Sequence, residues 1–110
     1  MNTRFFAKSF YTMMINIIIM EKRIEVIVEG IVQGVGFRYF AKKVAKEFGI
    51  KGYVKNLPDG RVYIVAEGDM NVLEKFLASI RRGPPLAVVK NVIVCEKEPT
   101  GEFEDFSILY

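Results

Sequence analysis

Residues 23–49 contain an alternating apolar stretch, a short glycine-rich run and a strongly amphipathic segment, in that order. In residues 23–29 Ile24, Val26 and Val28 alternate with charged side chains, which is the period of a half-buried strand; Ile27 breaks the alternation but still favours a strand. Residues 37–48 place apolar side chains at helical spacing with lysines on the opposite side, and Gly49 follows where a helix commonly ends. The pattern predicts a strand that leads through a tight loop into a helix.

The remaining periodicity predicts an α+β domain of the ferredoxin-like, split βαβ type. We expect strands over residues 50–57, 62–67 and 88–95, a helix over 71–82, a hairpin turn at 58–60 and a short terminal strand over 103–109. Asn71 and Glu74 are expected to cap the second helix. The order is βαββαβ plus a terminal strand. Because each helix has one apolar stripe, both should cover one face of an antiparallel sheet.

Length and composition predict one domain over residues 21–110. The chain has 110 residues and is 51% hydrophobic, which suits a single packed core. Residues 1–20 differ in composition from the rest of the chain, because they contain no acidic residue. Their apolar run is too short to cross a bilayer, and no signal-peptide cleavage site follows it. We interpret them as an N-terminal extension upstream of a natural start at Met20. A flexible tail or a weak membrane anchor is the alternative.

Charge and side-chain inventory narrow the possible chemistry. The net charge of +3 includes Arg4 and Lys8 of the first segment, so the domain itself is nearly neutral and lacks a general nucleic-acid surface. The chain has no histidine, and one cysteine cannot form an intrachain disulfide. Cys95 lies in a hydrophobic run and is expected to be a half-buried strand thiol, not a nucleophile. We expect no metal site and no cofactor.

An anion-binding loop is predicted by the run Val32-Gln33-Gly34-Val35-Gly36-Phe37-Arg38. Its glycines allow positive φ angles, so that successive N–H groups converge where the helix dipole also favours an anion. Arg38 adds a charge and a planar fork of donors. We therefore predict that phosphate contacts the loop from Gln33 to Phe37 and Arg38. The run lacks the Lys-Ser/Thr ending of a P-loop and the third glycine of a dinucleotide turn. A simple tight turn beside an exposed arginine is the alternative.

A second site residue is expected at Asn56, near the end of the second strand. This strand passes close to the loop, so a side chain near its end can face the bound anion. Asparagine before a hairpin is also a common turn former, which is the alternative interpretation.

Three segments together resemble the acylphosphatase family: VEGIVQGVGFR, GYVKNLPDGRV and GPPLAVV. The resemblance covers about residues 21–110, and residues 1–20 have no counterpart in the minimal family domain. It implies hydrolysis of the carboxyl–phosphate anhydride, without metal or cofactor, on a ferredoxin-like fold. It further implies that Arg38 binds the phosphoryl group together with the loop backbone, and that Asn56 holds the attacking water.

The side-chain inventory suits this reaction. An acyl phosphate leaves as a carboxylate, so no general acid has to protonate it, and inorganic phosphate is the second product. A non-catalytic, anion-binding regulatory module of the same fold is the main alternative. An RNA-binding split βαβ module is another, with Tyr53 and Tyr63 as its stacking residues. We expect a cytoplasmic monomer that binds a small acyl phosphate and neither nucleic acid nor membrane. The sequence does not identify the acyl group.

Overall fold

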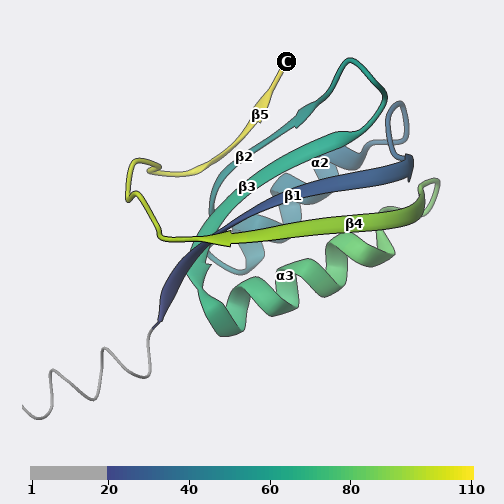
Figure 1. Ribbon diagram of the computed structural model, residues 1–110. Helices are drawn as coiled ribbons and strands as arrows, with labels where there is room; N and C mark the ends of the chain where they lie inside the picture. Colours follow the sequence, from purple (N-terminus) through teal and green to yellow (C-terminus); the bar gives the residue numbers. More distant parts are fainter. Residues whose placement is uncertain (1–19) are drawn as a thin grey trace, which may run out of the picture.

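Two helices and five strands lie in residues 20–110, the part of the chain that the computed structural model describes (Figure 1). In chain order they are β1 (Glu21–Ile31), α2 (Phe37–Glu47), β2 (Lys51–Asn56), β3 (Val62–Asp69), α3 (Met70–Arg82), β4 (Val88–Lys97) and β5 (Phe106–Leu109). This is the order predicted from the sequence. The extension expected over residues 1–20 lies, apart from Met20, outside the described residues, and its nature stays a prediction.

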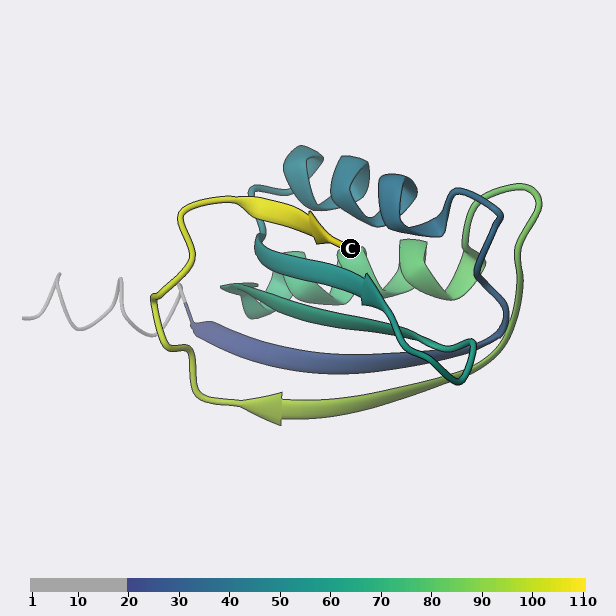
Figure 2. The same ribbon diagram turned by 90° about the horizontal axis from the view of Figure 1, so that it is seen from above.

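The strands form one sheet in the order β4-β1-β3-β2-β5. Its first three pairings, β4 with β1, β1 with β3 and β3 with β2, are antiparallel, and Figure 2 shows both helices on the same face of the sheet. The ferredoxin-like α+β fold is thus confirmed. The sheet is mixed rather than purely antiparallel, because β5 pairs parallel with β2. The chain leaves β4 at one edge, crosses to the other edge through residues 98–105, and enters β5 in the direction of β2.

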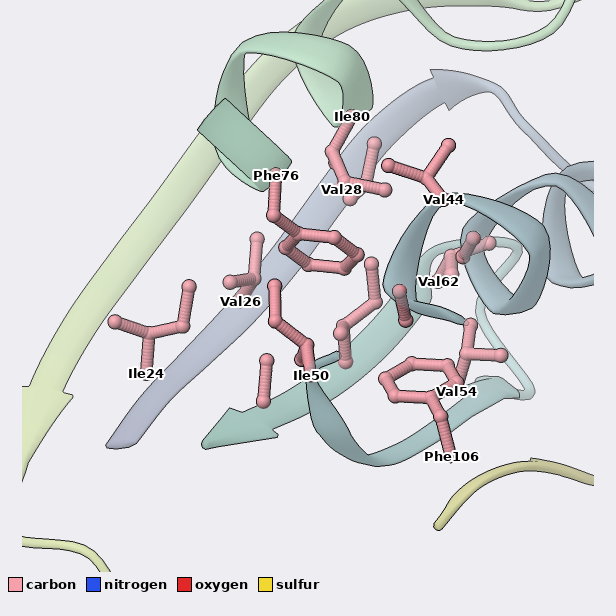
Figure 3. Packing of buried hydrophobic residues seen from close by; sticks show 14 of the residues in the cluster. Ile24, Val26, Val28, Val44, Ile50, Val54, Val62, Phe76, Ile80 and Phe106 are labelled. Carbon is pink, nitrogen blue, oxygen red and sulfur yellow. The ribbon is translucent and has the colours of Figure 1, made fainter. Parts of the chain in front are cut away.

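The core lies between the sheet and the two helices (Figure 3). Alternate residues of β1 and β3 point into it, as the period of two requires. Phe76 and Ile80 of α3 pack against them, and Val44 contributes from α2. The fully or nearly fully buried strand residues include Ile24, Val26, Val28, Val54, Val62, Ile64 and Ala66. Burial of these side chains determines which face of each strand points to the core, and therefore the register in which the strands pair.

Helix α3 begins one residue earlier than predicted and is capped by a different residue. Its N-cap is Asp69, whose carboxylate accepts a hydrogen bond from the backbone N–H of Asn71 at 2.8 Å. The expected cap by Asn71 and Glu74 was therefore wrong. Aspartate is as good an N-cap as asparagine, and here it directly ends β3.

Strand β4 is an edge strand, and most of its side chains are exposed. Cys95 is exposed as well, so the prediction of a half-buried thiol was wrong. The apolar run around Cys95 suggested burial, but β4 is an edge strand that pairs with β1 alone. Cys95 pairs with Glu25, which alternates with the core residues Ile24 and Val26, so Cys95 lies on the face of the sheet opposite the helices.

A buried carboxylate ties the crossing segment to the outer face of the sheet. Glu67 is 6% exposed and accepts hydrogen bonds from the N–H and hydroxyl of Thr100, both at 3.0 Å, and from the N–H of Gly101 at 3.0 Å. Arg23 donates to it at 3.2 Å. Burial raises the pKa of the Glu67 carboxyl, but the hydrogen bonds it accepts outweigh burial and hold the pKa below its ordinary value. Glu67 thereby anchors the segment that leads into β5.

Replacing Glu67 by glutamine is expected to lower the free energy of unfolding at pH 7 by about 2 kcal/mol, because a neutral amide replaces an ion that accepts several hydrogen bonds. In the wild type this stabilisation is complete above the ordinary carboxyl pKa of 4.5 and is lost as the pH falls through the lower folded value. Urea unfolding at neutral and acidic pH measures the difference, which should shrink below pH 4.5. Glu102→Gln is the control, since Glu102 is 57% exposed in its pair with Arg23. Equal losses in both variants would contradict the role of Glu67.

Candidate active site

The sheet brings three segments that are distant in sequence to one of its ends. Val62, the first residue of β3, pairs with Val28 of β1 on one side and with Asn56 of β2 on the other. Leu109 of β5 pairs with Lys55, next to Asn56. Figures 1 and 2 show the end of β1, the β2–β3 hairpin and the end of β5 at the same end of the sheet. The loop after β1 therefore lies close to Asn56 and to the end of β5.

The loop between β1 and α2 has the backbone conformation that the glycines predict. Gly34 has φ 75° and Gly36 has φ 77°, in the left-handed region. A Cβ atom at either position would meet nothing within 4 Å, so the backbone angle, not lack of space, requires glycine here. Gly36 is the N-cap of α2, and within residues 20–110 no side chain caps this helix start. The first N–H groups of α2 are thus available to an anion.

A cavity of ≈ 230 Å³ lies where these segments meet. It is lined by Val32, Gly34, Gly36, Phe37, Arg38, Tyr39, Asn56, Ile108 and Tyr110. The structure therefore brings together most of the predicted site residues. Gln33 and Val35 do not line the cavity: the Gln33 side chain hydrogen-bonds to the β2–β3 hairpin, and Val35 packs against the core.

Arg38 lies in the first turn of α2, and its side chain is held by the end of the chain. Its Nη1 atom donates to the carbonyl oxygen of Leu109 at 3.2 Å, and its guanidinium lies 4.7 Å from the ring centroid of Tyr110. One hydrogen bond and a cation–π contact leave other guanidinium donors free for a ligand. Ile108, Leu109 and Tyr110 were missed in the sequence, because only the parallel pairing of β5 with β2 brings them to Arg38.

Asn56 contributes an unsatisfied acceptor. Its Oδ1 atom is buried and has no hydrogen-bond partner among the described residues. Buried polar atoms are nearly always paired, because an unpaired one costs about 1–3 kcal/mol. Asn56 also lines the cavity, so its side chain is a candidate partner for a ligand or a water molecule.

Known proteins with similar sequences and structures decide the family. The sequence profile of the acylphosphatase family matches residues 24–108. The acylphosphatase of Thermotoga petrophila is 58% identical over 89 residues, which are 81% of this chain and 98% of that protein. The chain belongs to the acylphosphatase family. The crystal structure of acylphosphatase from Bacillus subtilis superposes with a TM-score of 0.79 at 42% identity, covering 81% of this chain and 99% of that one.

A domain of a much larger protein is also similar. In the crystal structure of full-length HypF, in its phosphate- and nucleotide-bound form, the match has a TM-score of 0.74 and 33% identity, and covers 84% of this chain but 12% of that one. The acylphosphatase fold thus occurs both as a chain of about this size and inside a longer polypeptide.

Two further observations concern membranes and metals. Neither helix in residues 20–110 is long and apolar enough to cross a bilayer. In the same part of the chain, no three aspartate, glutamate or cysteine side chains come together as a metal site would require, and the sequence has no histidine.

Proposed function

We propose a metal-free, in-line mechanism for this member of the acylphosphatase family, an enzyme that hydrolyses acyl phosphates to carboxylate and inorganic phosphate. The phosphoryl group occupies the cavity and accepts hydrogen bonds from the N–H groups of residues 33–37 and from Arg38. The left-handed glycines and the uncapped start of α2 support this placement, since both aim donors at one point. These groups stabilise the charge on the equatorial phosphoryl oxygens, which is the main demand of phosphoryl transfer.

The single observation that carries the proposal is the buried, unpartnered Oδ1 of Asn56, a residue that lines the same cavity as Arg38. In our proposal this oxygen accepts a hydrogen bond from the attacking water and orients it opposite the leaving group. An amide can both donate and accept, and it does not have to change its protonation state. Its role is that of the glutamine that orients water in GTPases.

Bond changes in this mechanism balance without a catalytic acid. The water oxygen forms a bond to phosphorus as the bond between phosphorus and the acyl oxygen breaks. The leaving carboxylate is a weak base, so it departs unprotonated. The phosphoryl oxygens accept the proton of the attacking water.

Hydrolysis of benzoyl phosphate by the purified protein is expected to be unchanged by an excess of EDTA. The reason is the set of donors in the cavity: the described residues that line it contribute no carboxylate, thiolate or imidazole side chain, the groups that bind divalent cations. Release of phosphate with and without EDTA measures this. Activity that EDTA abolishes and Mg²⁺ restores would contradict the metal-free mechanism. No activity with or without EDTA would contradict the proposal that the protein is an enzyme that hydrolyses acyl phosphates.

Other functions have less support. The similarity to a small part of HypF shows that this fold occurs inside a longer protein, but the chain covers 98% of the acylphosphatase of Thermotoga petrophila, which favours the enzyme over a regulatory module. For RNA binding, Tyr53 and Tyr63 would need free faces. Their ring centroids lie 6.1 Å apart in an edge-to-face pair, and Phe103 packs on Tyr53 at 5.8 Å. The monomeric state and the cytoplasmic location stay predictions.

A further inference from the structure

The side chain of Gln33 connects the phosphate loop to the β2–β3 hairpin. Its amide nitrogen donates to the carbonyl oxygen of Leu57 at 2.8 Å and to that of Arg61 at 2.9 Å. Carbonyl oxygens only accept, so the amide nitrogen must face them and both of its hydrogens are used. The side chain is therefore held by two bonds in one orientation.

These two carbonyls belong to the base of the hairpin. The N–H of Leu57 donates to the carbonyl oxygen of Arg61 at 2.8 Å, and the N–H of Gly60 donates to that of Leu57 at 3.1 Å. Leu57 directly follows Asn56 in the chain. Gln33 thus binds the backbone one peptide away from the residue that is proposed to orient the water.

The sheet itself provides only an indirect connection between the two halves of the site. The phosphate loop follows β1 and Asn56 ends β2, but β3 lies between these strands. An ion pair between Glu29 and Arg61, with 3.9 Å between its nearest atoms, also spans the gap. Both partners are more than a third exposed, so this pair contributes little. Gln33 is the better-placed link.

We propose that Gln33 is a positioning residue that sets the distance between the phosphate loop and Asn56. It acts through Asn56 and does not touch the substrate with its side chain. The proposal rests on the proposed function, because it assigns Gln33 a part in aligning water with the phosphoryl group. Alignment of this kind is sensitive, since a displacement of about 1 Å can reduce a rate about a hundredfold.

The test is a double-mutant cycle with Gln33→Met and Asn56→Ala, using benzoyl phosphate as substrate and inorganic phosphate as competitive inhibitor. Methionine has a similar length but cannot donate either bond, and it keeps the backbone N–H of the loop. We expect Gln33→Met to lower kcat about tenfold or more and to change the inhibition constant of phosphate less than about threefold. In the Asn56→Ala background the same substitution should change kcat less than about twofold, because the group that it positions is absent.

Glu29→Gln is the matched control, since it removes the other link to the same hairpin and should leave kcat unchanged. Unchanged kcat in Gln33→Met would overturn the proposal. It would also be overturned if the reductions in kcat caused by Gln33→Met and Asn56→Ala multiplied in the double mutant, or if Gln33→Met weakened phosphate binding as much as it lowered kcat. Circular dichroism melting checks that the variants fold. If Gln33→Met does not fold, the test is repeated with Gln33→Asn, whose side chain is one methylene too short to reach both carbonyls.

A measurement without turnover separates this proposal from the proposed function. The side-chain amide signal of Asn56 in a ¹⁵N–¹H spectrum should shift in Gln33→Met and stay in place in Glu29→Gln. An unshifted signal in Gln33→Met would contradict the positioning role whether or not the protein hydrolyses benzoyl phosphate. Retention of wild-type kcat by Asn56→Ala would instead contradict the proposed function.

Discussion

Arg38→Ala is expected to lower kcat/KM for benzoyl phosphate by about a thousandfold or more and to abolish inhibition by inorganic phosphate in the millimolar range. Loss of an arginine that stabilises a transferring phosphoryl group has effects of about this size. Among the described residues that line this cavity, Arg38 has the only side chain with a full positive charge, and Leu109 and Tyr110 already hold it in place. Steady-state kinetics together with phosphate inhibition measure both effects.

Two further variants separate the effect of the Arg38 side chain from that of its charge. Arg81→Ala makes the same change in net charge at an exposed position of α3, away from the cavity, and should retain wild-type kinetics. Arg38→Lys keeps the charge but loses the planar fork, so it should recover only part of the activity. An Arg38→Ala variant that still binds phosphate as the wild type does would show that the loop backbone suffices, and the role assigned to Arg38 would be wrong.

Asn56→Ala is expected to reduce kcat at least about a hundredfold, by analogy with the loss of one oxyanion-hole donor, while phosphate inhibition remains within a few fold of the wild type. The position of Asn56 is the reason for the different effects on kcat and on phosphate binding: it lines the cavity and has an unpartnered Oδ1, but it does not belong to the loop that would hold the anion. The variant also removes a buried unsatisfied atom, so its thermal stability should not fall greatly.

Asn91→Ala is a suitable control for Asn56→Ala. Asn91 lies on β4, where its side chain donates to Glu29 at 2.9 Å on the surface, and it does not line the cavity. It should have wild-type kcat. Wild-type kcat in Asn56→Ala would mean that another group orients the water, and the role assigned to Asn56 would be wrong.

The fold was largely predictable because its elements have clear periods. The buried residues of β1 alternate along the strand, and α2 has one apolar stripe followed by Gly49. The errors occurred where tertiary context decides. The cap of α3 depends on Asp69 at the end of a strand, and the exposure of Cys95 depends on β4 being an edge strand. Neither property is visible in local hydrophobicity.

The site was predictable only in part, for a similar reason. Glycines with a following arginine indicate an anion loop locally, and the family resemblance added a role for Asn56. The contacts of Arg38 with Leu109 and Tyr110 depend on the parallel pairing of β5, which no local pattern reveals. The side chain of Gln33 gave no signal of its own, because its partners are backbone carbonyls of a distant hairpin.

The strand order also influences how the protein folds. Val26 of β1 pairs with Ile64 of β3 and with Val94 of β4, so long loops must close before either ladder contributes to stability. Chains dominated by such non-local contacts fold slowly, with rates in about the millisecond-to-second range. Because the residues that line the cavity come from the loop after β1, from α2, from β2 and from β5 with the chain end, a partly assembled sheet does not form the complete cavity. The rate at which enzymatic activity returns during refolding is thus expected to report the last step of sheet assembly rather than the initial hydrophobic collapse.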